Sequence, residues 1–518
     1  MAHNEAIAVK KLAAIILLLA ALLGGVAVYQ HRAAPSAATP TLTVYCAAGL
    51  QKPVSAIVEA YRREAGVEVR TQFGGTGSLL SALRVARQGD LFIAADDGAV
   101  ADARKTETIR EVFPVAVQHP IIAVRKGNPK HIQSLADLLR DDVKVALANP
   151  EAASISRVSR KALGDTWEKL AARATVMKPT VTEIAADVSL GTVDAGIIWD
   201  ATAAQFKETQ VVEVPELSDR KENASACVLS FCTQPTAALR FARYLTAPEK
   251  GGAVFKENGF TPAGGDKWTD KPELILYSGG VNRPAIEGLL HQFADREGVT
   301  LTTVFNGCGI LCASMKTMGG TSNPKFPDAY YACDLCFVPP VADVFPEAVI
   351  LTETDIGIVV PKGNPHRVKT LADLAQPNLK VGLCNAEQAT LGYMTRGMLK
   401  SSGLQDSVHK NVVVETPTAD LLVNQMRVGA LDAAIVYRVN FQPSAEFLEY
   451  LPIQHEGAHA VQPFAVRGDS HHHHLGLRLL DFLKANRAQF EQSGFQWRGE
   501  AAAIRSKDIV IPDWLKDK

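Results

Sequence analysis

Short runs of aliphatic and β-branched residues alternate along most of the chain with longer segments whose apolar residues recur every three to four positions. The first run is Leu42–Cys46, and the helix pattern after it has its apolar face at Val54, Ile57, Val58 and Tyr61. That i, i+3, i+4, i+7 spacing is typical of an amphipathic helix. Alternating strands and helices predict parallel sheets covered by helices. We therefore expect an α/β fold.

The series of segments occurs twice, in the same order, at an offset of about 232–238 residues. Matching segments are Leu42–Cys46 with Leu274–Ser278, Phe73–Gly77 with Phe305–Gly309, Lys126–Pro129 with Lys362–Pro365, and Asp194–Trp199 with Asp432–Tyr437. Each copy is about 225–240 residues long, which suits two lobes better than one. We predict two tandem α/β units, 41–265 and 272–512, each with two lobes around a ligand cleft and joined by a linker over 263–272.

Residues 1–40 precede the duplicated part. Lys10 and Lys11 stand before an uninterrupted stretch of 17 apolar or small residues, Leu12–Val28. This arrangement predicts export. Because the stretch is longer than most signal-peptide cores and short for a spanning helix, cleavage and retention as an N-terminal hydrophobic anchor helix are both open. In either case the residues after Arg32 face the periplasmic, extracytoplasmic side.

The composition restricts the classes of function. The 518 residues include 54 Lys and Arg against 55 Asp and Glu, for a net charge of −1, and no basic run stands out, so no nucleic-acid partner is expected. An apolar content of 47% excludes a largely disordered chain. The sequence has no nucleophile elbow and no repeated Ser-His-Asp or paired-carboxylate motif, so we expect neither an enzyme nor a bound cofactor.

Small, uncharged residues fill the loops that follow the predicted strands. Cys46–Gly49 and Gly75–Ser78 occupy these loops in the first copy, and Ser278–Gly280 does so in the second. In an α/β sheet the ligand lies beyond the carboxyl ends of the strands. Helix N-termini at that edge favour an anion through their free N–H groups and dipole. Because such loops recur in both copies, we predict sites for a small oxyanion held by neutral donors.

The ordered motifs resemble the molybdate- and tungstate-binding proteins of ABC importers, which are type II periplasmic solute-binding proteins. The resemblance covers residues 41–512, twice, and rests on Gly75–Ser78, Gly89–Asp96, Lys126–Pro129, Asn149–Glu151 and Gly196–Trp199. It implies a non-enzymatic protein whose two lobes close over an oxyanion such as molybdate or tungstate and deliver it to an ABC transporter permease.

Position by position, the resemblance also implies the ligand contacts. In the first copy these are Ala48, Gly49, Thr76, Ser78, Ala153, Ser154, Val181 and Trp199. In the second copy they are Ser278, Gly279, Cys308, Gly309, Ala389, Thr390 and Tyr437. Both copies depart from the family pattern. The first lacks a serine in its first loop and has Trp199 where a tyrosine is expected, whereas the second carries Cys308 at the position of Thr76.

Half of the eight cysteines form a cluster in the sequence, namely Cys308, Cys312, Cys333 and Cys336. In an exported protein a disulfide among them is the first expectation, buried free thiols are the second, and a zinc or copper thiolate site is the third. Cys227 and Cys232 are a further candidate pair. With a metal bound, the chain would be a membrane-anchored sensory or metal-handling module. We expect His471–His474 to form a solvated helix N-terminus.

Overall fold

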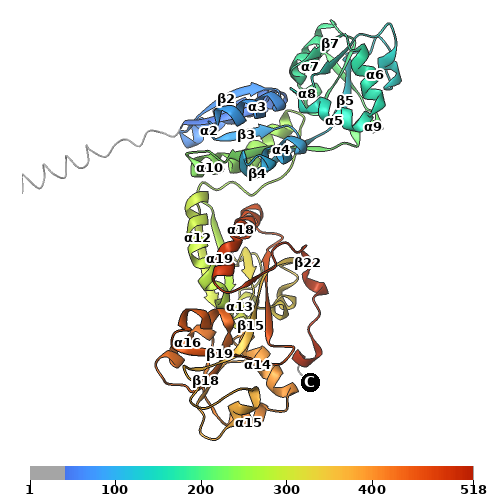
Figure 1. Cartoon of the computed structure of the whole chain (residues 1–518). Coiled ribbons are helices and arrows are strands. Elements are labelled where there is room, and N and C mark those ends of the chain that lie inside the picture. The colour runs from blue at the N-terminus through green and yellow to red at the C-terminus, as the bar shows by residue number, and fades with distance from the viewer. Residues whose placement is uncertain (1–40, 517–518) are drawn as a thin grey trace, which may run out of the picture.

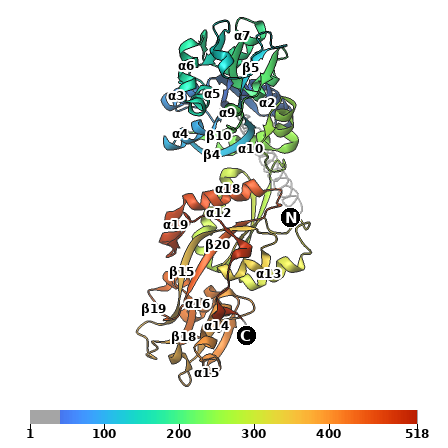
Figure 2. The ribbon, with the colours of Figure 1, turned by 90° about the vertical axis from the view of Figure 1, so that its right-hand side faces the viewer.

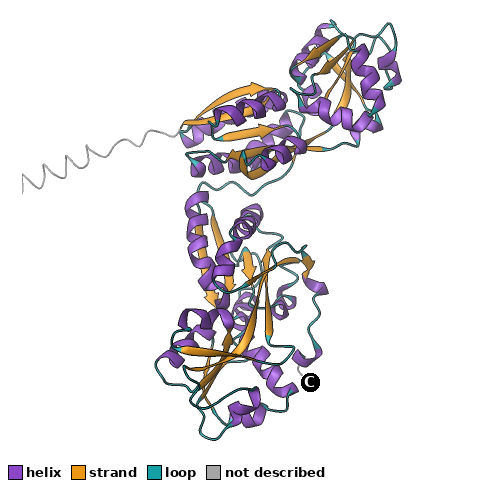
Figure 3. Ribbon diagram, viewed as in Figure 1, coloured by secondary structure: helices purple, strands orange, loops and turns teal. Residues whose placement is uncertain are grey.

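The computed structural model describes residues 41–516, which form two successive α/β units, each with two lobes (Figures 1 and 2). Helices flank the strands of each lobe (Figure 3). The two tandem units and the α/β class are therefore as predicted. Within the described residues, no helix has the length and apolarity needed to cross a membrane. The hydrophobic helix predicted over 12–28 lies outside them.

The first lobe of the first copy is built on a sheet with strand order β11-β4-β10-β3-β1-β2. Its strands are β1 (Thr41–Ala47), β2 (Glu68–Gly74), β3 (Leu91–Ala94), β4 (Ile109–Gln118), β10 (Glu222–Leu229) and β11 (Thr261–Pro262). Its helices are α2 (Gln51–Ala65), α3 (Thr76–Ala86), α4 (Asp97–Lys105), α10 (Pro235–Thr246) and α11 (Ala253–Glu257). Strands β2, β1 and β3 are parallel, so their carboxyl ends share one edge.

The second lobe of the first copy has the strand order β7-β6-β8-β5-β9. Its strands are β5 (Pro120–Arg125), β6 (Val145–Ala148), β7 (Val176–Lys178), β8 (Ala195–Trp199) and β9 (Thr209–Val212). Its helices are α5 (Ser154–Leu163), α6 (Asp165–Arg173), α7 (Val181–Leu190), α8 (Asp200–Ala204) and α9 (Pro215–Ser218). The chain enters this lobe from β4 and returns to the first lobe in β10, so two segments join the lobes.

The second copy repeats this plan with one difference in its sheet. Its strands are β12 (Glu273–Gly279), β13 (Thr300–Asn306), β14 (Ala329–Tyr331), β15 (Glu347–Pro361), β16 (Val381–Cys384), β17 (Val412–Thr416), β18 (Ala433–Tyr437), β19 (Leu448–Pro452), β20 (His459–Val466), β21 (Gln496–Trp497) and β22 (Ile504–Arg505). Strand β15 runs unbroken through both lobes, where the first copy is interrupted at His119 between β4 and β5. The strands of both lobes consequently belong to one sheet.

The helices of the second copy cover both lobes. They are α12 (Arg283–Glu297), α13 (Cys308–Thr317), α14 (Thr390–Ser401), α15 (Gln405–His409), α16 (Ala419–Arg427), α17 (Arg438–Phe441), α18 (His473–Ala485) and α19 (Arg487–Gln492). Helices α12 and α18 lie at the end that faces the first copy, and α12 packs against α10 (Figures 1 and 2).

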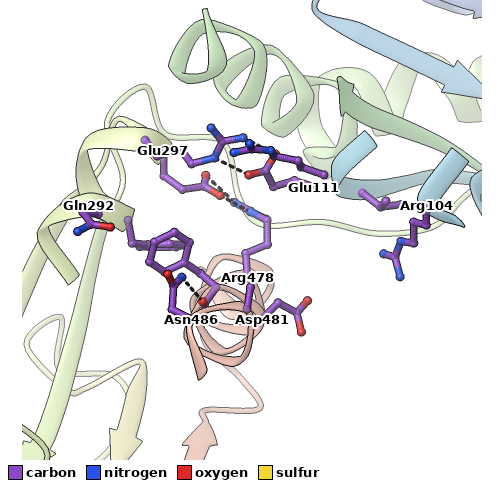
Figure 4. Close-up of a pocket in the computed structure, with 13 residues that line it drawn as sticks. Arg104, Glu111, Gln292, Glu297, Arg478, Asp481 and Asn486 are labelled. Atoms are coloured by element: carbon purple, nitrogen blue, oxygen red, sulfur yellow. Dashed lines mark hydrogen bonds and ion pairs between the residues drawn. The ribbon is translucent and has the colours of Figure 1, made fainter. Parts of the chain in front are cut away.

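A buried carboxylate holds the two copies together at this contact. Glu297, at the end of α12, accepts a hydrogen bond from Arg478 of α18 at 2.7 Å (Figure 4). It also accepts one from Arg243 of α10 at 2.8 Å. Beside it, Arg296 donates two bonds to Glu111, at 2.6 and 3.0 Å. Burial would raise the pKa of Glu297, but the charges of Arg478 and Arg243 hold it below its usual value.

The linker also fixes the start of α18. The carboxylate of Asp266 accepts hydrogen bonds from the backbone N–H groups of His474 and Leu475, both at 2.8 Å. A carboxylate at this position satisfies free helix N–H groups and complements the helix dipole. The histidine tract is thus at a helix N-terminus, as predicted. His472 and His473 are partly buried, so the tract is less solvated than expected.

We predict that Glu297→Gln destabilises the protein by about 3–5 kcal/mol at pH 7, because it leaves two buried guanidinium charges without their partner. The pKa of Glu297 is lowered in the folded state, so the stability that its charge supplies is complete above the unfolded pKa of about 4.3 and is lost as the pH falls through the lower folded pKa. The difference between the variant and the parent should shrink in the same range. Urea unfolding at pH 7 and pH 3 measures both effects.

The control is Glu287→Gln on the same helix, where the Arg283 pair is exposed. It should cost no more than about 1 kcal/mol. Equal losses for the two variants would show that Glu297 does not hold the copies together.

Candidate functional site

The first copy encloses a small cleft between its lobes, at the carboxyl ends of the parallel strands. We call it the first cleft. It is lined by Ala47, Ala48, Gly49, Gly74, Gly75, Thr76, Ala95, Ala153, Ser154, Thr180, Val181 and Trp199. None of these residues carries a charge. The cleft volume is about 10 Å³, close to that of one water-sized sphere.

Three helices begin at this cleft. Helix α3 starts at Thr76, α5 at Ser154 and α7 at Val181. The first N–H groups of a helix have no partner within it, and its N-terminus carries a partial positive charge. No side chain caps α3 or α5. The convergence of these ends makes the cleft a site for a small anion without any cationic side chain.

Backbone contact closes the first cleft. The N–H groups of Gly77 and Ser78 donate to the carbonyl of Ala152 in the other lobe, at 2.9 and 3.3 Å. A Cβ atom at Gly75 would collide with the carbonyls of Ala152 and Pro179, and one at Gly77 with that of Glu151. These glycines are therefore needed for the lobes to approach. Their Gly-Thr-Gly motif indicated a ligand loop in the sequence, and its closing role becomes visible only in the structure.

An ion pair reinforces the closed arrangement of the first copy. Arg157 of α5 lies 3.4 Å from the carboxylate of Asp96, which follows β3 in the opposite lobe. Burial raises the pKa of Asp96, whereas the charge of Arg157 and a hydrogen bond from the backbone N–H of Ala99 oppose that rise. The guanidinium thus partly offsets the cost of burying the Asp96 carboxylate next to the cleft.

The second copy has a corresponding second cleft of about 20 Å³. It is lined by Gly280, Val281, Gly307, Cys333, Cys384, Ala389, Thr390, Leu391, Pro417, Thr418, Ala419 and Tyr437. Its two lobes are also closed by backbone contact, because the N–H of Ile310 donates to the carbonyl of Gln388 at 3.3 Å. A Cβ atom at Gly307 or Gly309 would collide with carbonyls of the opposite lobe.

The cysteines distinguish the second cleft from the first. All eight cysteines of the chain are free thiols, so none of the predicted disulfides is present. The Sγ atoms of Cys308 and Cys333 lie 3.1 Å apart. Burial would raise the pKa of Cys308, but hydrogen bonds from Cys333 hold it below its usual value, and the pKa of Cys333 is raised by the same pairing.

The four clustered cysteines do not form a metal centre. Within residues 41–516, no three His, Cys, Asp or Glu side chains are placed to hold a metal ion together. Cys312 lies instead against the Tyr330 hydroxyl at 3.7 Å and the Phe337 carbonyl at 3.6 Å. Its position on the inner face of α13 turns its thiol toward the core.

Most of the predicted ligand residues line the two clefts, and some lie beside them. In the first copy only Ser78 is outside the lining. Its side chain is exposed, and its backbone N–H donates to the Ala152 carbonyl of the opposite lobe. In the second copy the residues outside the lining are Ser278, Gly279, Cys308 and Gly309. The hydroxyl of Ser278 is buried and bonds the Gly279 carbonyl at 3.3 Å.

Sequence reasoning missed Thr180 and Thr418, which precede α7 and α16 and line the two clefts. A signal was present for the first. Thr180 and Glu183 have the spacing of a capping box, which marks a helix N-terminus, and the Thr180 hydroxyl does accept a bond from the Glu183 N–H.

The fold and the paired clefts define a class, namely two-lobed binding proteins of the type II periplasmic kind, present here in tandem. The family described as bacterial extracellular solute-binding protein matches residues 42–261 and again residues 274–496. The chain belongs to this family.

Relatives and solved structures each match about half of the chain. The molybdate-binding protein ModA of Mycobacterium bovis is 28% identical over 234 residues, which cover 44% of this chain and 87% of the relative. ModA of Escherichia coli is 25% identical over 231 residues, covering 42% and 88%. The periplasmic molybdate-binding protein of Azotobacter vinelandii is a solved structure with 16% identity, a TM-score of 0.37, and coverage of 42% of this chain and 98% of its own.

We predict that Gly77→Ala prevents closure of the first cleft, because the added methyl group collides with the Glu151 carbonyl. Loss of the two inter-lobe hydrogen bonds should cost about 1–3 kcal/mol. Hydrogen exchange at the N-terminus of α3 should accelerate by a corresponding factor of about 5–150.

Gly288→Ala is the matched control, since nothing lies within 4 Å of its Cβ position in the middle of α12. It should leave exchange at α3 unchanged and stabilise α12 slightly. Normal protection in Gly77→Ala would show that the backbone contact does not control closure.

Proposed function

We propose that the protein is a non-enzymatic, extracytoplasmic binding protein that captures a small tetrahedral oxyanion of the molybdate class in its first cleft and delivers it to an ABC transporter permease. The observation that carries the proposal is the closed, uncharged cleft on which the N-termini of α3, α5 and α7 converge. The anion is a transported ligand and not a cofactor. The molybdate-binding relatives support this assignment.

The donors of the first cleft select among anions. Helix N–H groups and the hydroxyl of Thr76 can donate hydrogen bonds to an anion, whereas the Ser154 hydroxyl bonds the Asp96 carboxylate beside the cleft. No carboxylate lines the cleft itself to accept a hydrogen bond from a protonated anion. A fully deprotonated anion such as molybdate, tungstate or sulfate satisfies such a site. A protonated phosphate would leave its hydroxyl without a charged acceptor, so we expect it to bind more weakly.

The export segment over 12–28 fits this proposal. A binding protein for an importer must act outside the cytoplasm, and Lys10 and Lys11 followed by Leu12–Val28 supply an export signal or an anchor. We propose a periplasmic location, with the chain either tethered to the membrane by this segment or released after cleavage.

We predict that Thr76→Ala weakens molybdate binding by about 1–2 kcal/mol, or about 5- to 30-fold, the scale of one hydrogen bond to a charged ligand. Thr76 is 2% exposed and lines the cleft. Titration calorimetry on the full chain with molybdate, tungstate, sulfate and phosphate measures both the affinity and the order of preference.

Ser81→Ala is the control, because Ser81 lies on the exposed face of the same helix and should not alter any of these affinities. Unchanged binding in Thr76→Ala would refute the placement of the ligand. If none of the four anions binds the parent protein, the proposed function fails.

A further inference from the structure

The second cleft differs from the first in three neighbouring positions that change together. Ala47, Thr76 and Ala95 of the first copy correspond to Gly279, Cys308 and Cys333 of the second. A Cβ atom at position 279 would collide with the Cys333 sulfur and lie 3.2 Å from that of Cys308. The methyl group that the first copy has at Ala47 is therefore incompatible with the thiol pair, and Gly279 makes room for it.

The opposite wall of the second cleft carries a buried hydroxyl group without a partner. Tyr437 Oη has no hydrogen-bond partner among the described residues, whereas the Thr390 hydroxyl lies against the sulfurs of Cys308 and Cys333. Thr390 is 1% exposed and Tyr437 is 3% exposed, and both line the cleft together with Cys333. Buried polar groups are normally hydrogen-bonded, so an unpaired hydroxyl across from a thiol pair indicates a missing ligand with oxygen atoms.

We propose that the second cleft binds a thiophilic trivalent oxyacid of the arsenite class through Cys333, which lines it, and Cys308, which lies outside the lining with its sulfur 3.1 Å from that of Cys333. The remaining oxygen of the oxyacid faces Tyr437. This inference rests on the proposed function in one respect only, namely that the second copy closes over a small ligand as the first does.

The separation of the two sulfurs, which here form a direct S–H···S hydrogen bond, also matches the spacing that this class requires. With bonds of about 2.3 Å, a linear two-coordinate metal ion would hold its sulfurs about 4.6 Å apart, and a pyramidal centre with angles near 90° would hold them about 3.2 Å apart. The observed distance is 3.1 Å. A tetrahedral metal needs further protein ligands, and the residues that the structure describes supply no such group.

The reaction needs no oxidant. Two S–H bonds and two As–OH bonds break, two As–S bonds form, and two water molecules leave, while arsenic stays trivalent and keeps one hydroxyl group. Cys308 is the first residue of α13, where the helix dipole favours the attacking thiolate. Hydrogen bonds from Cys333 also hold the pKa of Cys308 below its usual value. Burial raises the pKa of Tyr437, which keeps its hydroxyl protonated as a donor to the remaining oxygen.

The test titrates the reduced full chain with sodium arsenite in a thiol-free phosphine reductant and counts arsenic per chain by intact mass. We expect one arsenic atom per chain, and at least a 10-fold loss of affinity in both Cys308→Ser and Cys333→Ser. Cys312→Ala should bind arsenite as the parent does, because Cys312 lies outside the cleft lining and its thiol packs against Tyr330 and Phe337. Molybdate binding in the first cleft serves as the folding control for every variant.

Several outcomes would overturn the inference. These are no arsenic adduct, an adduct that survives loss of Cys308 or Cys333, a strong dependence on Cys312, and binding of zinc or copper(I) but not of arsenite. If molybdate still binds while arsenite does not, this inference fails alone. If molybdate does not bind the parent protein, the proposed function fails independently of the arsenite result.

Discussion

Backbone contact between the lobes is the constraint on which both clefts depend. Gly77 and Ser78 donate to the Ala152 carbonyl in the first copy, and Ile310 donates to the Gln388 carbonyl in the second. Such contact leaves no room for a side chain, so each cleft can hold only a small ligand. It also brings the N-termini of several helices to one point, where their dipoles add.

The same two-lobed fold forms two clefts whose linings differ chemically. In the first copy the cleft is lined by neutral groups, and Arg157 partly offsets the cost of burying Asp96 beside it. In the second copy Tyr393 stands at the position of Arg157, and two thiols replace a hydroxyl and a methyl group. Duplication thus preserved the closing glycines while the residues at the centre of each cleft diverged. The buried Glu297 then joins the copies, so that two binding units act as one molecule.

Much of the fold was predictable from residue patterns. The spacing of Val54, Ile57, Val58 and Tyr61 predicts α2, and the repeated segments predict two tandem units, because amphipathic periodicity reports directly on burial. The unbroken β15 was not predictable. Its counterpart in the first copy is interrupted at His119, and whether two strands join depends on how the lobes are oriented.

The sequence by itself determined the duplication, the α/β class and the uncharged loops at the strand ends, since these follow from local order and composition. Only the tertiary structure decided which groups meet. In the folded protein the Ser78 side chain is exposed outside the first cleft, and Cys333 rather than Cys312 lies beside Cys308. Glu297 contacts Arg243 and Arg478. These contacts join residues that are distant in the chain or that lie on different faces of a helix, and spacing along a sequence does not specify which side chains a folded core brings within bonding distance.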